Sequence, residues 1–242
     1  MSEPGKRSPD NRTHATAPQR ASGARAVRPK DAASLVLTRR TRAGLEVLKG
    51  RRHKKTRFMP DVFVFPGGRT DAADARARPA TPIGHAVEAH LTRSVTAARA
   101  RALAMTAVRE TFEETGLLLG AAGSVGGTRD EGWAAVRRTG LAPDLARLDY
   151  VGRAITRAAS PIRFDARFFL ADAEHFTGAL GGSGELLDLA FVPLGHAREL
   201  PSAMITQFML SEVARLGEAA PAQRTKRAEY RWSGNQRVVT YV

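Results

Sequence analysis

One acidic stretch in the middle of the chain constrains the fold more strongly than any other feature of the sequence. Its carboxylates are spaced i, i+3 and i+4, so on an α-helix all three crowd onto one face. They belong to Glu110, Glu113 and Glu114. The opposite face carries an apolar stripe that would pack inward, and Gly116 stands where helices commonly end in a left-handed residue. We therefore predict a helix that begins between Ser94 and Arg99 and ends at Thr115.

Carboxylates at this spacing repel one another, so folding alone gives no reason to collect them. A divalent cation gives a reason, because oxygen ligands suit Mg²⁺ and Mn²⁺. The alternative is a solvated acidic helix that carries an ion pair between Arg109 and Glu113. A second feature, upstream in the chain, favours the metal interpretation.

This second feature is a short apolar run, Val62–Phe65, that leads directly into Pro66, Gly67 and Gly68. Such a run predicts a buried strand that breaks into a loop. Because glycine lacks a side chain, the paired glycines would let the backbone approach a ligand such as a phosphate closely.

Together the two features resemble the Nudix hydrolase signature, G-x5-E-x7-R-E-U-x-E-E-x-G-U, in which U is aliphatic. The second half is matched from Arg109 to Leu117 as Arg-Glu-x-x-Glu-Glu-x-Gly-Leu. The spacing departs from the pattern, because Gly68 lies 41 positions before Arg109 instead of 14. The inner glutamate is also missing. Its place falls on Asp74 when counted from Gly68, and on Arg101 when counted back from Arg109.

An interrupted signature of this kind is similar to the Nudix branch that includes the peroxisomal coenzyme A diphosphatases. That group carries two arginines six positions apart upstream of the glycines, a spacing that Arg51 and Arg57 match. The motif's glycine is replaced here by Asp61, and its small residues by Arg52 and His53. The resemblance therefore implies a reaction class and leaves coenzyme A as one candidate substrate.

The resemblance implies an α/β fold, a Nudix-type α/β/α sandwich with a mixed sheet. It also implies a metal-dependent pyrophosphohydrolase, in which water attacks the phosphorus of a nucleoside diphosphate linked to another moiety. The substrate would be coenzyme A or acyl-coenzyme A, or alternatively ADP-ribose, NADH or a nucleoside triphosphate. A non-catalytic Nudix-fold ligand sensor or nucleic-acid-binding module is the alternative from another class. The three clustered carboxylates argue against that alternative, and the missing inner glutamate favours it.

The same resemblance assigns the site residues. The three glutamates would bind Mg²⁺ or Mn²⁺, and Arg109 would orient one of them by a charge-assisted hydrogen bond. Glu185 is a candidate fourth carboxylate, with a charge at a strand edge as the alternative. The expected catalytic residues are Glu110, Glu113, Glu114 and Arg109. The expected substrate-binding residues are Gly67, Gly68, Arg51 and Arg57.

Composition excludes some other enzyme classes and locates the charge. The chain has no cysteine, which excludes a thiolate hydrolase, and it has no Gly-x-Ser-x-Gly elbow of a serine hydrolase. Of the net charge of +14, residues 1–30 carry +5 and residues 31–58 carry +7. We interpret residues 1–30 as a disordered basic tail and residues 31–242 as the Nudix domain. The charge ahead of the glycines could attract a polyanionic small-molecule substrate, and nucleic acid is the less favoured partner.

The sequence contains neither an apolar run long enough to span a membrane nor the h-region of a signal peptide. We therefore expect a cytoplasmic protein without a membrane partner, with a homodimer as one oligomeric alternative.

The remaining segments yield a coarse map. Residues 69–97 form an insertion within the signature, and we expect either a substrate lid or a passive surface excursion. Gly120–Gly127 is interpreted as a flexible linker, and Arg167 as a residue that contacts phosphate or faces water. Predicted strands cover 33–38, 45–48, 62–65, 150–156, 163–170 and 186–193, with a terminal hairpin over 230–242. Predicted helices, besides the acidic one, cover 86–91, 133–138 and 205–216.

Overall fold

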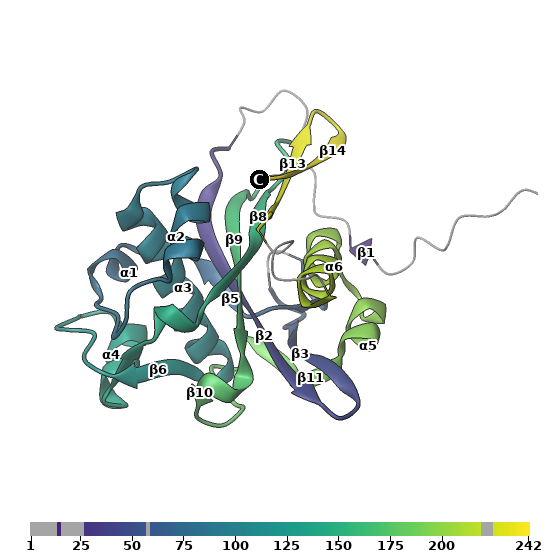
Figure 1. Ribbon diagram of the computed structural model, residues 1–242. Coiled ribbons are helices and arrows are strands. Elements are labelled where there is room, and N and C mark those ends of the chain that lie inside the picture. The colour runs from purple at the N-terminus through teal and green to yellow at the C-terminus, as the bar shows by residue number, and fades with distance from the viewer. Residues whose placement is uncertain (1–13, 16–26, 57–58, 219–224) are drawn as a thin grey trace, which may run out of the picture.

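A computed structural model describes residues 14–15, 27–56, 59–218 and 225–242, and shows a central sheet between two layers of helices (Figure 1). One face of the sheet is covered by α1 (Ala72–Arg76), α2 (His85–Thr92), α3 (Ala97–Thr115) and α4 (Glu131–Arg138). The other face is covered by α5 (Leu194–Glu199) and α6 (Met204–Glu218). The predicted α/β/α sandwich is confirmed.

The main sheet is mixed and runs in the order β11-β3-β2-β9-β8-β13-β14. Strands β2 and β9 are parallel, as are β8 and β13, while the other neighbours are antiparallel. The bounds are β2 (Lys30–Thr41), β3 (Gly44–Arg52), β8 (Asp149–Ile155), β9 (Phe164–Asp172), β11 (Leu186–Pro193), β13 (Ala228–Ser233) and β14 (Gln236–Tyr241). These strands confirm the predicted hairpins at both ends of the domain.

Two short strands carry the glycine segment along the sheet. Strand β4 (Phe63–Val64) pairs with β3, and β5 (Gly67–Arg69) pairs antiparallel with β2. The expectation of a loop at Gly67 and Gly68 is therefore wrong, because their backbone continues the hydrogen-bonded ladder opposite Ala33 and Ser34. The glycines are held in a fixed register rather than in a mobile turn.

Short strand pairings occur in two segments for which composition predicts a linker or a disordered tail. Strand β6 (Leu118–Ala122) pairs with β7 (Leu141–Pro143) and β10 (Phe176–Thr177), so the first part of the predicted linker Gly120–Gly127 is a strand. The predicted disorder of residues 1–30 falls mostly outside the described residues. Within them, β1 (His14–Ala15) pairs with β12 (Ser202–Ala203). Two 3-10 turns, Leu145–Arg147 and Ala173–His175, complete the fold.

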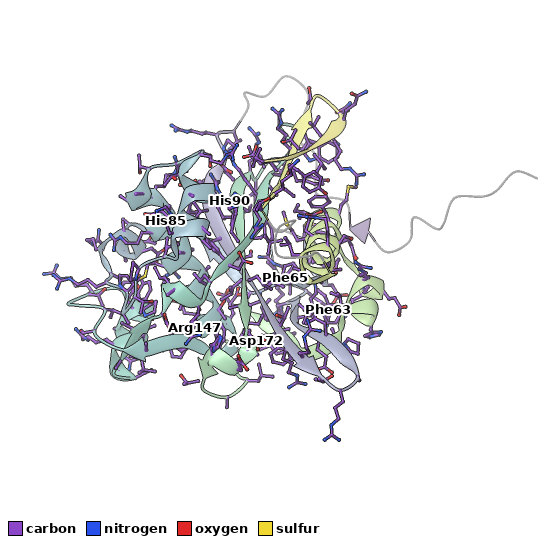
Figure 2. The ribbon with its side chains drawn as sticks, in the orientation of Figure 1. Phe63, Phe65, His85, His90, Arg147 and Asp172 are labelled. Atoms are coloured by element: carbon purple, nitrogen blue, oxygen red, sulfur yellow. The ribbon has the colours of Figure 1, made fainter. Side chains whose placement is uncertain are left out.

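The core lies on both faces of the sheet. Leu35 and Leu37 of β2 point toward α3, and Val36 points toward α6, so this strand is buried on both sides. Phe65 lies on the α6 side (Figure 2). Its ring packs edge-on against that of Phe168, with the ring centroids 6.4 Å apart. Each fully buried side chain of this size stabilises the fold by roughly 1.5–3 kcal/mol.

The insertion is part of this core. Helices α1 and α2 both pack on α3. Val87 and Leu91, one turn apart on α2, are buried together with Ala73 and Ala77. The insertion is therefore not a passive surface excursion, because removing it would expose one side of α3, and its role as a substrate lid stays a prediction.

The acidic helix has the predicted bounds. Thr96 caps the N-terminus of α3 by accepting a hydrogen bond from the Arg99 backbone N–H, and Gly116 ends the helix with φ 74°. A Cβ at Gly116 would lie 2.5 Å from the Ala179 carbonyl oxygen, so only glycine fits. Arg167, in contrast, is fully buried and paired with Asp165, so it neither faces water nor reaches a ligand. No helix among the described residues is long and apolar enough to cross a membrane.

Candidate active site

The site is organised by a buried ion pair between α1 and α3. Arg109 donates from Nε to Asp74 Oδ1 at 2.7 Å and from Nη2 to Asp74 Oδ2 at 3.1 Å. Both residues are shielded from water, with relative exposures of 7% for Arg109 and 0% for Asp74. Asp74 also accepts from Trp133 Nε1 at 2.9 Å and from Thr106 Oγ1 at 2.8 Å. Two of these donors, Arg109 and Thr106, lie on α3 and the third, Trp133, lies on α4, so the Asp74 carboxylate ties α1 to both helices and fixes the rotation of α3.

The inner glutamate of the expected signature is thus replaced. Asp74, six positions after Gly68, holds Arg109 across the insertion. Arg101, the residue found by counting back from Arg109, donates instead to the carbonyl oxygens of Ala75 and Ala77 at the end of α1. The count from the glycine therefore finds the residue that contacts Arg109.

The three glutamates point in two directions. Glu114 accepts a hydrogen bond from the Gly67 backbone N–H at 2.9 Å, and Glu110 lies so close to Gly68 that a Cβ there would come within 2.5 Å of both carboxylate oxygens. Glu113 instead accepts from Arg109 Nη1 at 3.2 Å and lies against Gly132 of α4. Glu110 and Glu114 therefore share the side of the helix that faces the glycine strand.

The electrostatics of these carboxylates follow from their burial. Burial raises the pKa of Glu110 to about 7, although Arg109 opposes the shift. Burial, with smaller contributions from the neighbouring charges of Glu110 and Glu185, raises the pKa of Glu114 to about 8 against the hydrogen bond from Gly67. Burial also raises the pKa of Glu113. Burial lowers the pKa of Arg109, but the hydrogen bond to Asp74 and the negative charges of Glu110, Asp74 and Glu113 outweigh this effect, so the pKa lies above its usual range.

A glycine-rich loop between β10 and β11 covers the C-terminal end of α3. The backbone N–H of Gly181 donates to the Thr115 carbonyl at 2.9 Å, and that of Ser183 donates to the Glu113 carbonyl at 2.8 Å. The next turn of this loop carries Glu185, which is exposed and close enough to Glu114 to affect its pKa. The candidate fourth carboxylate thus lies beside one of the three signature glutamates.

Two clefts flank the glycine strand. The first, of about 510 Å³, is lined by Glu110 and Arg109 together with residues at the starts of β2 and β9. The second, of about 420 Å³, is lined by Glu114 and Glu185 together with the basic end of β3 and the loop after it. Glu110 can therefore be reached from the first cleft and Glu114 from the second.

No protein-family model matches the chain, and no curated protein matches it. Among solved structures, a Nudix hydrolase from Alicyclobacillus acidocaldarius is 31% identical, with a TM-score of 0.61 over 77% of this chain and 92% of the other. The chain belongs to the Nudix hydrolase family. A MutT protein from Bacillus halodurans (11% identity, TM-score 0.47, 87% of this chain and 97% of the other) is also similar. So is the Nudix domain of Shewanella oneidensis NrtR in complex with ADP ribose (12%, 0.45, 78% and 88%).

This Nudix hydrolase is accordingly an enzyme that acts on diphosphate bonds, which confirms the predicted reaction class. The coenzyme A branch, the substrate and the individual site residues stay predictions.

Of the two predicted substrate-binding arginines, the structure describes only Arg51. Arg51 is engaged in ion pairs with Asp61 and Asp188, each at 2.6 Å. Both aspartates have left-handed backbones, with φ of 58° and 51°, so Arg51 ties two strained segments together at the edge of the second cleft. Arg57 lies outside the described residues. One of the two arginines that match the spacing of the coenzyme A motif, Arg51, is therefore held in ion pairs within the protein.

Other cleft residues carry no sequence signal. Lys30 and Arg69 line the first cleft of this Nudix hydrolase beside Glu110, yet neither belongs to the signature. They meet because β5 pairs with β2 in a register that sets Arg69 opposite Ala32. Pairing of this kind is decided by the tertiary fold rather than by local spacing.

The donor chemistry of the Nudix site fits a divalent cation. Among the described residues, no three His, Asp or Glu side chains converge as a ready-made metal site. Mg²⁺ is, however, commonly held by one or two carboxylates together with substrate phosphates instead of an all-protein cage. Glu110 and Glu114 provide two such carboxylates, and burial raises the pKa of both although Arg109 pairs with Glu110, so their desolvation leaves room for further positive charge. A bound cation would supply that charge.

Proposed function

We propose that this enzyme uses Mg²⁺ or Mn²⁺ to hydrolyse the diphosphate of a nucleoside diphosphate linked to a second group. The observation that carries the proposal is the placement of a half-buried carboxylate, Glu110, and a buried one, Glu114, against the two glycines of β5. Mutually repelling carboxylates that are shielded from water beside a side-chain-free backbone suit a cation and a phosphate better than any structural role.

The residues of the chain divide the work as follows. Glu110 and Glu114 would hold the cation, with Glu185 as a further carboxylate at the rim of the second cleft. Gly67 and Gly68 let the diphosphate come close to these carboxylates. A bound divalent cation polarises phosphoryl oxygens and lowers the pKa of water at the site.

Arg109 and Glu113 would position the metal-binding carboxylates rather than bind the substrate. The guanidinium of Arg109 is committed to Asp74, Glu110 and Glu113, so it orients carboxylates instead of binding substrate. Glu113 is half-exposed on the α4 side and could join the cation only by leaving Arg109. We therefore rank Glu110 and Glu114 ahead of Glu113 as ligands.

For the substrate we propose a disubstituted diphosphate. Coenzyme A and acyl-coenzyme A are the first candidates because of the interrupted signature, and ADP-ribose and NADH are the alternatives. The pairing of Arg51 with Asp61 and Asp188 weakens the case for coenzyme A, because that guanidinium is not free to meet a 3′-phosphate.

A substrate panel tests the proposal. Coenzyme A, acyl-coenzyme A, NADH, ADP-ribose and nucleoside triphosphates are each incubated with Mg²⁺ and with Mn²⁺, and the phosphate-containing products are identified. At least one diphosphate should be cleaved, and Glu114→Gln should lower its kcat by about two orders of magnitude, as expected for loss of a ligand from a catalytic metal site. Turnover by Glu114→Gln near the wild-type rate would overturn the proposed role of the carboxylates.

A further inference from the structure

We propose that the first cleft binds the nucleoside 5′-monophosphate half of the substrate, with Lys30 and Arg69 on the phosphate and an apolar rim on the base. The inference rests on the proposed function and adds to it a direction of binding. It assigns specificity to residues outside the signature.

Two cationic side chains, Lys30 and Arg69, line the first cleft. Arg69 directly follows Gly68 in β5, and Lys30 begins β2, the strand with which β5 pairs. Both side chains are exposed and line the first cleft beside Glu110. Neither makes a hydrogen bond or an ion pair to any other described residue. Arg163, in the same cleft, is instead held by the carbonyl oxygens of Val27 and Thr156. Lys30 and Arg69 are therefore available to an anion.

The cleft also contains acids, but these are committed to the fold. Asp71 caps α1 by accepting from the Ala73 backbone N–H at 2.9 Å, and Asp130 caps α4 by accepting from the Trp133 backbone N–H at 3.0 Å. A carboxylate at a helix N-terminus is partly compensated by the helix dipole. The positive charge of Lys30 and Arg69 is thus only partly offset next to the place where a phosphate would lie.

The rim of the first cleft is apolar. Val27 and Ile162 are 37% and 36% exposed, which places them among the few large hydrophobic side chains that the described part of the chain leaves exposed. Pro161 and Phe164 continue the same rim. Convergent cations next to exposed apolar side chains suit a ligand that has a phosphate at one end and a flat ring at the other. A nucleoside monophosphate is such a ligand.

The second cleft has a different character. Its lining is polar and charged, with one apolar side chain, that of Leu186. A ring would meet fewer apolar side chains there than on the rim of the first cleft, whereas a sugar phosphate or a phosphorylated arm would find hydrogen-bond partners. Its polar lining comprises Arg52, His53, Lys55, Thr56, Glu114, Ser183, Gly184 and Glu185. The contrast between the clefts gives the substrate its direction.

The test is binding of product-like probes by calorimetry, with Mg²⁺ present and without turnover. AMP represents the half assigned to the first cleft, ribose 5-phosphate the other half, and adenosine and inorganic phosphate separate the ring from the anion. Arg69→Ala should weaken AMP binding about tenfold or more, because one charge-assisted hydrogen bond is lost, while adenosine changes less than twofold. Ile162→Ser should weaken AMP and adenosine alike.

Two control variants carry the same kinds of change elsewhere. Arg40→Ala removes an exposed arginine from the far end of β2 and should leave all probes unchanged. Lys55→Ala removes an exposed cation from the second cleft and should weaken ribose 5-phosphate but not AMP. If Lys55→Ala weakens AMP and Arg69→Ala does not, or if both Arg69→Ala and Lys30→Ala bind AMP as the wild type does, the assignment is overturned.

The two proposals fail separately. AMP binding that depends on Arg69, without hydrolysis of any compound in the substrate panel, would leave the cleft assignment standing and remove the proposed reaction. Hydrolysis of a compound in the panel, together with AMP binding that does not depend on Arg69 or Lys30, would support the proposed reaction and remove the cleft assignment.

Discussion

Replacement of Asp74 with asparagine should destabilise the protein severely while leaving the shape of the side chain almost unchanged. The amide keeps one acceptor oxygen but presents an N–H₂ group to donors, and it removes the charge that compensates Arg109. Arg109 would keep a buried positive charge whose side chain is only 8% exposed. Its remaining partners, Glu110 and Glu113, lie 3.0 and 3.2 Å away. Glu110 has a raised pKa of about 7 and so carries only part of its negative charge at pH 7, and Glu113 is half-exposed.

The expected magnitude follows from this burial. Removing one partner of a buried ion pair typically costs about 3–5 kcal/mol. Because Glu110 and Glu113 offset part of the remaining charge, we expect a loss of about 3 kcal/mol in the free energy of unfolding. Domains of this size have roughly 5–15 kcal/mol in total, so the variant should fold and remain measurable.

Urea denaturation is the appropriate assay, followed by the fluorescence of the two tryptophans, Trp133 and Trp232, of which Trp133 donates to Asp74 and reports the same region. Glu46→Gln is the matched control, since it removes an ion pair of 2.6 Å between Glu46 and Arg39 on the outer β2–β3 hairpin. Exposed pairs contribute about 0–1 kcal/mol, so this control should change little. The double variant Asp74→Asn/Arg109→Met should recover part of the loss. A loss below about 1 kcal/mol in Asp74→Asn would refute the argument that this pair fixes α3.

Three further predictions concern the site. Gly68→Ala should lower kcat at least about a hundredfold with little change in circular dichroism, because the new methyl group meets Glu110. Gly84→Ala should leave the activity unchanged, because the atom nearest to its new Cβ, the Ala146 carbonyl oxygen, is 4.0 Å away. In metal-free protein, the raised pKa values of about 7 and 8 mean that Glu110 and Glu114 favour folding fully below the ordinary pKa of 4.5 and lose that contribution as pH rises through 7 to 8. Thermal melts should therefore show a falling midpoint over that range, a gain from Mg²⁺ that grows with pH, and a flatter profile in Glu114→Gln; a midpoint that rises would contradict the sign. Arg51→Ala should lower kcat/KM equally for coenzyme A and its 3′-dephospho form, since Arg51 acts through Asp61 and Asp188, and a selective loss on coenzyme A would show that it binds substrate.

The parts of the fold that local sequence decides were predictable. The bounds of α3 follow from helical periodicity and from a glycine at its end, and the β2–β3 hairpin follows from two apolar runs around Thr41–Gly44. The carboxylates could be found for the same reason, because their spacing places them on adjacent turns of one helix.

What depends on tertiary pairing could not be found in this way. The composition of residues 69–97 suggests a surface segment, but Val87 and Leu91 are buried because α3 offers them an apolar face. Gly120–Ala122 resembles a linker and is a strand because β7 supplies its hydrogen-bond partners. The partner of Arg109 could be proposed by counting, since Asp74 lies at the signature spacing from Gly68. Its burial under Trp133 could not, because α4 is far away in the sequence.

The central claim, that water attacks a phosphorus of the diphosphate at the carboxylates of α3, can be tested by isotope labelling. The compound from the substrate panel that is cleaved fastest is hydrolysed in ¹⁸O-water with Mg²⁺, with enzyme in excess so that each molecule turns over once. We predict that one ¹⁸O atom enters one of the two phosphate products in this first turnover, and that Glu114→Gln slows the labelling about a hundredfold. Unlabelled products in the first turnover, or labelling at the wild-type rate in Glu114→Gln, would contradict the claim.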